Sequence, residues 1–214
     1  MSFISQLLTT INGWLTHSGL IPASAILTVS IFLIKEYLES RRKKKTKTNE
    51  ISALKKIFAR ECELNWYLSS QIETICRTFK PYETGAQNCP YELSILNTPS
   101  GKTTYELTGG EDGVEGGGLP KAHATVFEKH MYDVVKHDAE FYEKLEAAYE
   151  ATLELKHLRD SIIDIQHTGA RLNVDNLMIG FSGYALDEIK YINLAIKDLY
   201  KFCTQKRVIV GRLR

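Results

Sequence analysis

The hydrophobic and polar positions divide the chain into an uncharged leader and a longer part in which apolar and charged faces recur. No Asp, Glu, Lys or Arg occurs between Met1 and Ile34. Within this leader, residues 14–34 read WLTHSGLIPASAILTVSIFLI, and a helix of 21 residues rises about 30 Å, the thickness of the hydrocarbon core of a bilayer. The pattern predicts a transmembrane helix over residues 14–34, preceded by an uncharged amphipathic lead over residues 1–13.

Two other interpretations of the leader stay open. A secretory signal peptide carries bases ahead of its apolar core, whereas the first base of this chain is Lys35, which follows the apolar run. A buried helix of a soluble domain rarely stays uncharged over 34 residues. The membrane-spanning helix fits the pattern better than either alternative.

Helical periodicity returns over residues 49–80, where apolar residues recur three and four positions apart. Asn49 is placed to cap this long helix, and Pro81 ends it. The same register puts two polar residues, Glu61 and Asn65, on the apolar face. That face consists of Ile51, Leu54, Phe58, Leu68, Ile72, Ile75 and Phe79.

Residues 81–123 interrupt the helices. Two short runs rich in β-branched and aromatic residues, 91–96 and 103–107, flank the sequence NTPSGK and predict a β-hairpin. The stretch GGEDGVEGGG follows with six glycines and three acids. Because the acids would repel phosphate, we interpret this stretch as a flexible connector and not as a phosphate-binding loop.

Residues 124–204 supply the remaining helices, and residues 205–214 form a basic tail. Helical patterning runs from Thr125 to Gln166, with Asp138 capping its second half, and again from Asn176 to Cys203. The predicted buried stripe of the second half is Phe141, Leu145, Ala148, Thr152, Leu155, Leu158, Ile162 and Ile165, and its wet face carries Glu143, Glu146, Glu150 and Glu154. The last helix is expected to bury Leu186, Ile189, Ile192, Ile196, Leu199 and Phe202.

Together these elements predict a mainly α fold. An N-terminal transmembrane helix would precede a cytoplasmic bundle of three or four long helices, with a small β-hairpin and loop insertion.

Residues 35–48 form a polybasic juxtamembrane segment. From Lys35 to Lys47 seven bases stand against two acids, a net charge of +5, and since the whole chain is +1, residues 48–214 carry about −4. Basic segments are retained in the cytoplasm, so we predict a single-pass protein of the bacterial inner membrane with its N-terminus outside and its C-terminal domain cytoplasmic. The mildly acidic remainder makes nucleic acid an unlikely partner. The bases expected to face anionic lipid are Arg41, Arg42, Lys43, Lys44 and Lys45.

Small and polar residues within the predicted span suggest contacts between copies. Small residues spaced along a helix allow close approach of a neighbouring helix, and a thin polar line would suit a pore. The alternative is chance placement. The candidate positions for an oligomer or pore are Gly19, Ala23, Ser30, His17, Ser24 and Thr28.

Candidate chemistry is sparse. The cysteines lie far apart without a CxxC pair, which favours a reducing compartment and excludes a zinc knuckle. Three histidines recur every seven residues, about 10 Å apart on a helix and too far to share a metal. No GxSxG, HExxH or Walker loop occurs, so no catalytic, cofactor-binding or metal-binding residue is assigned, no cofactor is expected, and a non-enzymatic role is favoured while activity stays open. The residues concerned are Cys62, Cys76, Cys89, Cys203, His123, His130 and His137, with Glu154 and His157 forming a single ExxH.

The chain bears a resemblance in plan to two known groups. Arg159 and His167 lie on one predicted helix, and this arrangement resembles the HEPN nuclease superfamily, whose helical dimers share an Arg and a His at a ribonuclease site. In that family four to six residues separate the Arg from the His, whereas seven separate them here. The order of leader, bases, FARECELNWYLSSQIETI and YEKLEAAYEATLELKHLRDSI resembles uncharacterised bacterial single-pass membrane proteins. In plan the chain is also similar to the membrane-anchored HEPN-like accessory effector of type VI-B CRISPR systems, a pore-forming protein. No specific motif carries these likenesses, so no site residue is transferred.

We therefore expect a membrane-anchored helical protein that self-associates or docks a protein partner, as a pore-type effector or accessory component of bacterial antiviral defence or stress response. One alternative is a membrane-tethered HEPN-like ribonuclease that uses Arg159 and a nearby histidine. Another is a structural subunit of an envelope complex.

Overall fold

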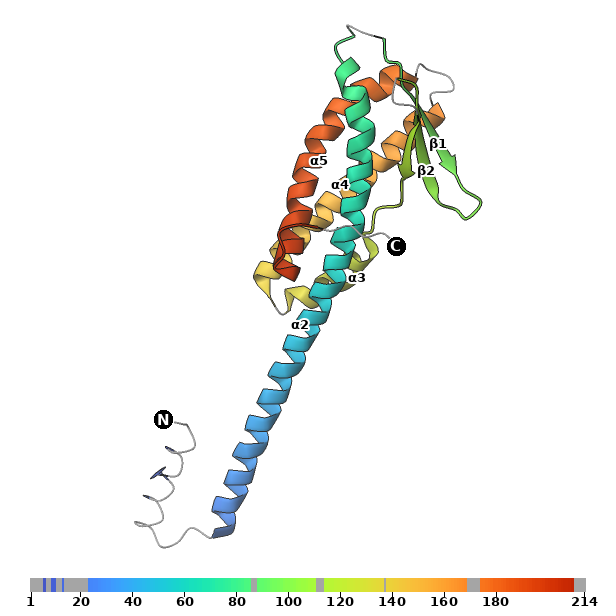
Figure 1. Ribbon diagram of the computed structural model, residues 1–214. Coiled ribbons are helices and arrows are strands. Elements are labelled where there is room, and N and C mark those ends of the chain that lie inside the picture. Colours follow the sequence, from blue (N-terminus) through green and yellow to red (C-terminus); the bar gives the residue numbers. More distant parts are fainter. Residues whose placement is uncertain are drawn as a thin grey trace. The chain divides into compact units, whose positions relative to one another are not determined.

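The computed structural model describes residues 6, 9, 10, 13, 23–85, 88–110, 114–136, 138–168 and 174–209. Labels follow Figure 1. The elements in chain order are helix α2 (Ala23–Phe79), the 3₁₀ turn η1 (Lys80–Tyr82), strands β1 (Glu92–Asn97), β2 (Thr103–Thr108) and β3 (Glu115–Gly118), and helices α3 (Thr125–Val135), α4 (Ala139–Thr168) and α5 (Val174–Thr204). The chain divides into two compact units, Met1–Glu50 and Ile51–Arg214, which are described separately below.

The predicted transmembrane helix over residues 14–34 is wrong. Among the described residues, no helix combines the length and the apolar character that crossing a membrane requires. The physical reason lies in where α2 begins among the described residues: only 12 residues, Ala23 to Ile34, precede the first base, Lys35, and they rise about 18 Å, well short of about 30 Å of hydrocarbon. The described residues form a mainly α fold, and none of their helices is the spanning helix expected from the sequence.

Helix α2 also corrects the expected helix start. It runs without interruption through residues 35–48 and through Asn49, so Asn49 is an interior helical residue and not an N-cap. The polybasic segment is therefore helical. Straight-chain Lys and Arg are good helix formers, which explains why the charges do not break the helix.

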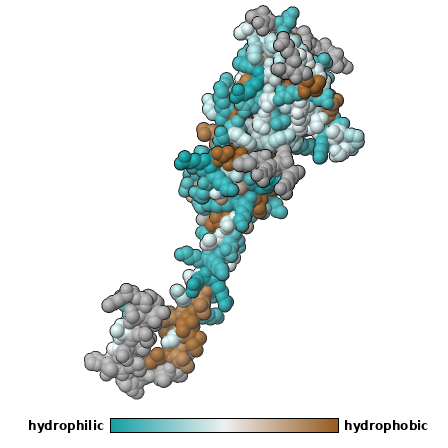
Figure 2. All heavy atoms as spheres, viewed as in Figure 1, coloured by the Kyte–Doolittle hydropathy of each residue, from teal (hydrophilic) through white to brown (hydrophobic). Residues whose placement is uncertain are grey.

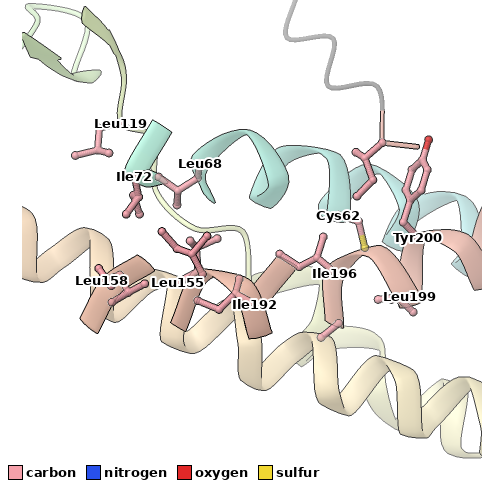
Figure 3. Packing of buried hydrophobic residues seen from close by; sticks show 14 of the residues in the cluster. Cys62, Leu68, Ile72, Leu119, Leu155, Leu158, Ile192, Ile196, Leu199 and Tyr200 are labelled. Carbon is pink, nitrogen blue, oxygen red and sulfur yellow. The ribbon is translucent and has the colours of Figure 1, made fainter. Parts of the chain in front are cut away.

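The second unit is a helical bundle around one hydrophobic core. Helices α4 and α5 pack side by side, and α3 packs on α4 (Figure 1). Figure 3 shows Leu68 and Ile72 of α2 meeting side chains from α4 and α5. The predicted stripes are confirmed at the fully buried positions Phe58, Leu68, Ile72, Ile75, Phe79, Phe141, Leu145, Ala148, Thr152, Leu155, Leu158, Ile162, Ile189, Ile192, Ile196 and Leu199.

The predicted hairpin is confirmed and a third strand joins it. β1 and β2 pair antiparallel, with Ile95 opposite Tyr105. β3 pairs antiparallel with β2, placing Gly117 opposite Tyr105. The described part of GGEDGVEGGG therefore includes a strand, where a flexible connector was expected.

Glycine at position 117 lets β3 lie against α2. A Cβ on Gly117 would come within 2.1 Å of Gln71 Oε1. Gln71 Oε1 accepts a hydrogen bond from Tyr105 Oη at 3.3 Å, so a larger residue would push the amide away from its partner. Glycine is needed here for close approach and not for chain flexibility.

The junction between α3 and α4 follows the sequence prediction. The Phe141 amide donates to Asp138 Oδ1 at 3.1 Å, which is the N-cap bond expected at the start of α4. His137, the third of the regularly spaced histidines, lies outside the described residues.

Candidate functional site

Large apolar side chains are exposed along the α2 segment of the first unit. Their exposed fractions lie between 38% and 65%. Successive helical residues are about 100° apart, so these side chains cover every side of the helix. A helix that is apolar all round is normally covered by lipid or protein. We call this the apolar segment: Leu27, Val29, Ile31, Phe32, Leu33, Ile34, Tyr37 and Leu38.

The collar, residues 35–47, brings the predicted lipid-facing bases together on the same helix. The five bases from Arg41 to Lys45 are all exposed and surround the helix axis. Lys43 Nζ lies 2.8 Å from Glu39 Oε1. This hydrogen bond and the Coulomb attraction raise the pKa of Lys43 and lower the pKa of Glu39. Because both groups are in water, the pair adds little stability.

The apolar segment is followed along the helix axis by the five bases Arg41 to Lys45 of the collar. Leu38 and Arg41 are separated by about 4.5 Å of rise. Figure 2 shows the brown apolar surface at the start of α2 followed by teal hydrophilic surface. This sequence of layers matches a boundary at which hydrocarbon meets charged headgroups.

The predicted oligomer positions are only partly described. Gly19 and His17 lie outside the described residues, and Ala23 and Ser24 are the first residues of α2. Thr28 is exposed and Ser30 is half-buried. Self-association through these small residues stays a prediction.

A buried polar clamp in the second unit explains why Asn65 lies on an apolar face. Asn65 Nδ2 donates to the His123 carbonyl at 3.0 Å and to Thr152 Oγ1 at 3.2 Å, and the His123 amide donates to Asn65 Oδ1 at 2.7 Å. The clamp ties the segment that enters α3 to both α2 and α4. Its polar atoms are satisfied, as buried polar groups must be, so its role is structural.

Glu61 lies one turn before Asn65 and beside the same histidine. Glu61 Oε2 is 3.8 Å from His123 Nδ1. Desolvation raises the pKa of Glu61, while desolvation and the nearby Arg60 lower the pKa of His123. Both pKa shifts favour the neutral forms of the side chains, so the two residues do not form a strong ion pair. The separation of 3.8 Å is also long for a charge-assisted hydrogen bond.

Arg159, the residue of the HEPN resemblance, is engaged in the fold. It is 7% exposed. Its Nε donates to the Leu119 carbonyl at 3.2 Å, Nη2 to Thr103 Oγ1 at 3.4 Å and Nη1 to Asp160 Oδ1 at 2.8 Å. These bonds fix the exit of β3 against α4. His167 is exposed and about 12 Å further along the helix, so the structure does not bring the pair together.

The thiols show no sign of reactive chemistry. Cys62, Cys76 and Cys203 are free thiols. Burial raises the pKa of Cys76 and of Cys203 to about 12, so neither is a thiolate at neutral pH. Across the part of the chain that the structure describes, no three His, Cys, Asp or Glu side chains are placed to hold a metal ion.

A groove of about 500 Å³ lies between the end of α2 and the middle of α5. Its charged walls include Arg77 beside Glu73, at 2.5 Å, and Lys190 beside Asp187, at 2.7 Å. Since these charges already neutralise one another, the groove offers no strong electrostatic attraction to a charged ligand.

The comparisons with known proteins leave the resemblance in plan as a prediction. No protein-family model, curated protein or solved structure matches this chain.

Proposed function

We propose that this protein attaches to an anionic membrane surface through α2 and presents its helical bundle as an interaction domain. The observation that carries the proposal is that, on the exposed first part of α2, the apolar segment is followed directly by the bases Arg41 to Lys45 of the collar. Apolar side chains enter the lipid, and the bases lie at the headgroups. The role of the bundle as an interaction domain is supported by its buried polar residues, Asn65 and Arg159, whose hydrogen bonds hold the fold together.

The apolar segment is large enough to hold the protein at a membrane. Full burial of one large apolar side chain contributes about 1.5–3 kcal/mol. Transfer of about four such residues would match the roughly 8 kcal/mol of a micromolar dissociation constant. The apolar segment has eight, which leaves a margin for incomplete burial and for the entropy lost on binding.

Flotation of the full-length chain with vesicles tests the proposal. A variant with Ile31, Phe32 and Ile34 changed to Ser should lose at least tenfold in partition to vesicles, because three exposed apolar side chains are removed. The matched control changes Leu96, Tyr132 and Val135 to Ser, which removes three exposed apolar side chains from the second unit. Equal loss in both variants, or no flotation of the unchanged protein, would refute membrane attachment through α2.

A further inference from the structure

One side of helix α5 carries exposed apolar residues that the core does not use. Leu177, Tyr184 and Tyr191 are 40%, 46% and 71% exposed. They are seven residues apart, which is about two helical turns, so they align along one side. The buried stripe of α5 runs through other positions, such as Ile189 and Ile192. The aligned side chains are therefore a second apolar surface, outside the core.

The adjoining side of α4 is acidic. Tyr184 Oη donates to Glu154 Oε1 at 2.9 Å, which joins the two helices into one surface. Glu143, Glu146 and Glu150 continue from Glu154 at helical spacing and are exposed. In the described part of the chain, none of the four carboxylates forms an ion pair with a base. We call this the aromatic–acidic face: Leu177, Tyr184, Tyr191, Glu143, Glu146, Glu150 and Glu154.

We propose that the aromatic–acidic face binds the collar of a second copy of this chain. The inference goes beyond membrane attachment, because it assigns a self-association surface to the bundle. The charges are complementary: four carboxylates that form no ion pair within the described residues would face a helical segment whose net charge is +5. The lengths also agree, since Glu143 to Glu154 rise about 17 Å and the collar rises about 18 Å.

The apolar parts of the two surfaces can also meet. Tyr37 and Leu38, within the collar, are 65% and 45% exposed, and Ile34 immediately precedes it. Packed against Leu177, Tyr184 and Tyr191, they would bury apolar area beside the charge pairs. A basic helix with exposed apolar neighbours is the kind of ligand that an acidic, aromatic helix face fits.

This contact joins two different surfaces, so it is heterologous. Such contacts build a reciprocal pair or a ring where the geometry closes, and a chain of copies where it does not. The same bases are offered to anionic lipid in the proposed function. Anionic membrane and the aromatic–acidic face therefore compete for the collar, so binding to lipid dissociates the contact between copies.

Complementary charge reversal tests the contact with the full chain in a mild non-ionic detergent without lipid. One variant changes Glu143 and Glu150 to Lys. The other changes Arg42 and Lys44 to Glu and leaves the Lys43–Glu39 pair unchanged. Each variant alone should associate at least tenfold more weakly than the unchanged protein, and an equimolar mixture should recover association, because reversed collar then meets reversed face. Mass photometry of the separate and mixed samples measures this. The control changes Glu92 and Glu106, exposed on the sheet, to Lys.

A monomeric unchanged protein, a mixture that does not recover, or a control that dissociates equally would overturn the proposal. Vesicle flotation separates this outcome from failure of the proposed function. The variant with Glu143 and Glu150 reversed keeps its collar, so it should still float with anionic vesicles. Added anionic vesicles should also lower self-association of the unchanged protein, whereas zwitterionic vesicles should have less effect.

Discussion

Neutralising the collar should remove the preference of this protein for anionic membranes. The perturbation changes Arg41, Arg42, Lys43, Lys44 and Lys45 to Gln, which keeps helix-forming side chains and removes five charges. These five residues span about 6 Å of helix, less than the Debye length of about 8 Å at physiological salt. All five bases therefore act together at one headgroup layer.

The expected effect follows from the charge near the surface. Each base contributes about 1 kcal/mol at an anionic leaflet, so the five together contribute at most about 5 kcal/mol, or three to four powers of ten in partition. Binding to zwitterionic vesicles should change little, because the apolar segment is intact. Between about 0.1 and 1 M salt the unchanged protein should lose most of its anionic preference, since the Debye length falls to about 3 Å.

Flotation with phosphatidylcholine vesicles, with and without phosphatidylglycerol, measures both effects. The matched control changes Lys121, Lys129, Lys136, Lys156 and Lys201, all exposed in the second unit, to Gln and so removes the same charge. A collar variant that kept its preference for anionic vesicles would refute the reasoning. So would a control variant that lost as much as the collar variant, because net charge alone would then explain the binding.

Four further predictions concern the fold around the clamp, the sheet and the collar. Asn65→Ala should lower the free energy of unfolding by about 2–4 kcal/mol, because it leaves the half-buried backbone amide and carbonyl of His123 without this partner, whereas Thr152→Val should cost less; urea denaturation measures both. Gly117→Ala should cost about 1 kcal/mol through the displaced Gln71 amide, and the cost should shrink in a Gln71→Ala background, as a double-mutant cycle would show. Glu61→Gln should stabilise the protein at neutral pH. Because burial raises the pKa of Glu61 above its ordinary value of 4.5, stability falls as the pH rises from about 4.5 through the folded pKa, so the gain should vanish in acid, as urea denaturation at several pH values would reveal. Glu39→Gln should strengthen binding to anionic vesicles by up to about fivefold, since it removes one acid from the collar, and an unchanged affinity would argue against a headgroup contact there.

The sequence pattern identified most of the bundle because burial in a helix repeats every three to four residues. The stripes of α4 and α5 were predicted nearly residue by residue, and the Asp138 cap was predicted from its position before a new apolar period. The hairpin was predicted from β-branched and aromatic runs around a turn. The basic collar needed no structure either, because it is a property of consecutive residues.

Other features depended on contacts between distant residues. Gly117 lies in a stretch that looked like a linker, and only the neighbouring β2 and Gln71 explain it as part of a strand. Asn65 and Arg159 looked like a polar exception and a catalytic candidate until their partners, 58 and 40 residues away, were placed beside them. The predicted span shows the same limit: hydropathy counts apolar residues without establishing where a helix begins, and no helix among the described residues is long and apolar enough to cross a membrane.

The sequence by itself determined which residues are apolar, charged or helical, because those properties depend on composition and local spacing. Only the tertiary structure decided which of them are covered. It buried Asn65 and Arg159 in satisfied hydrogen bonds, left the apolar segment of α2 exposed, and set Tyr184 beside Glu154 across two helices. The physical reason is that burial and pairing are properties of three-dimensional neighbours, which the order of residues along a chain does not specify.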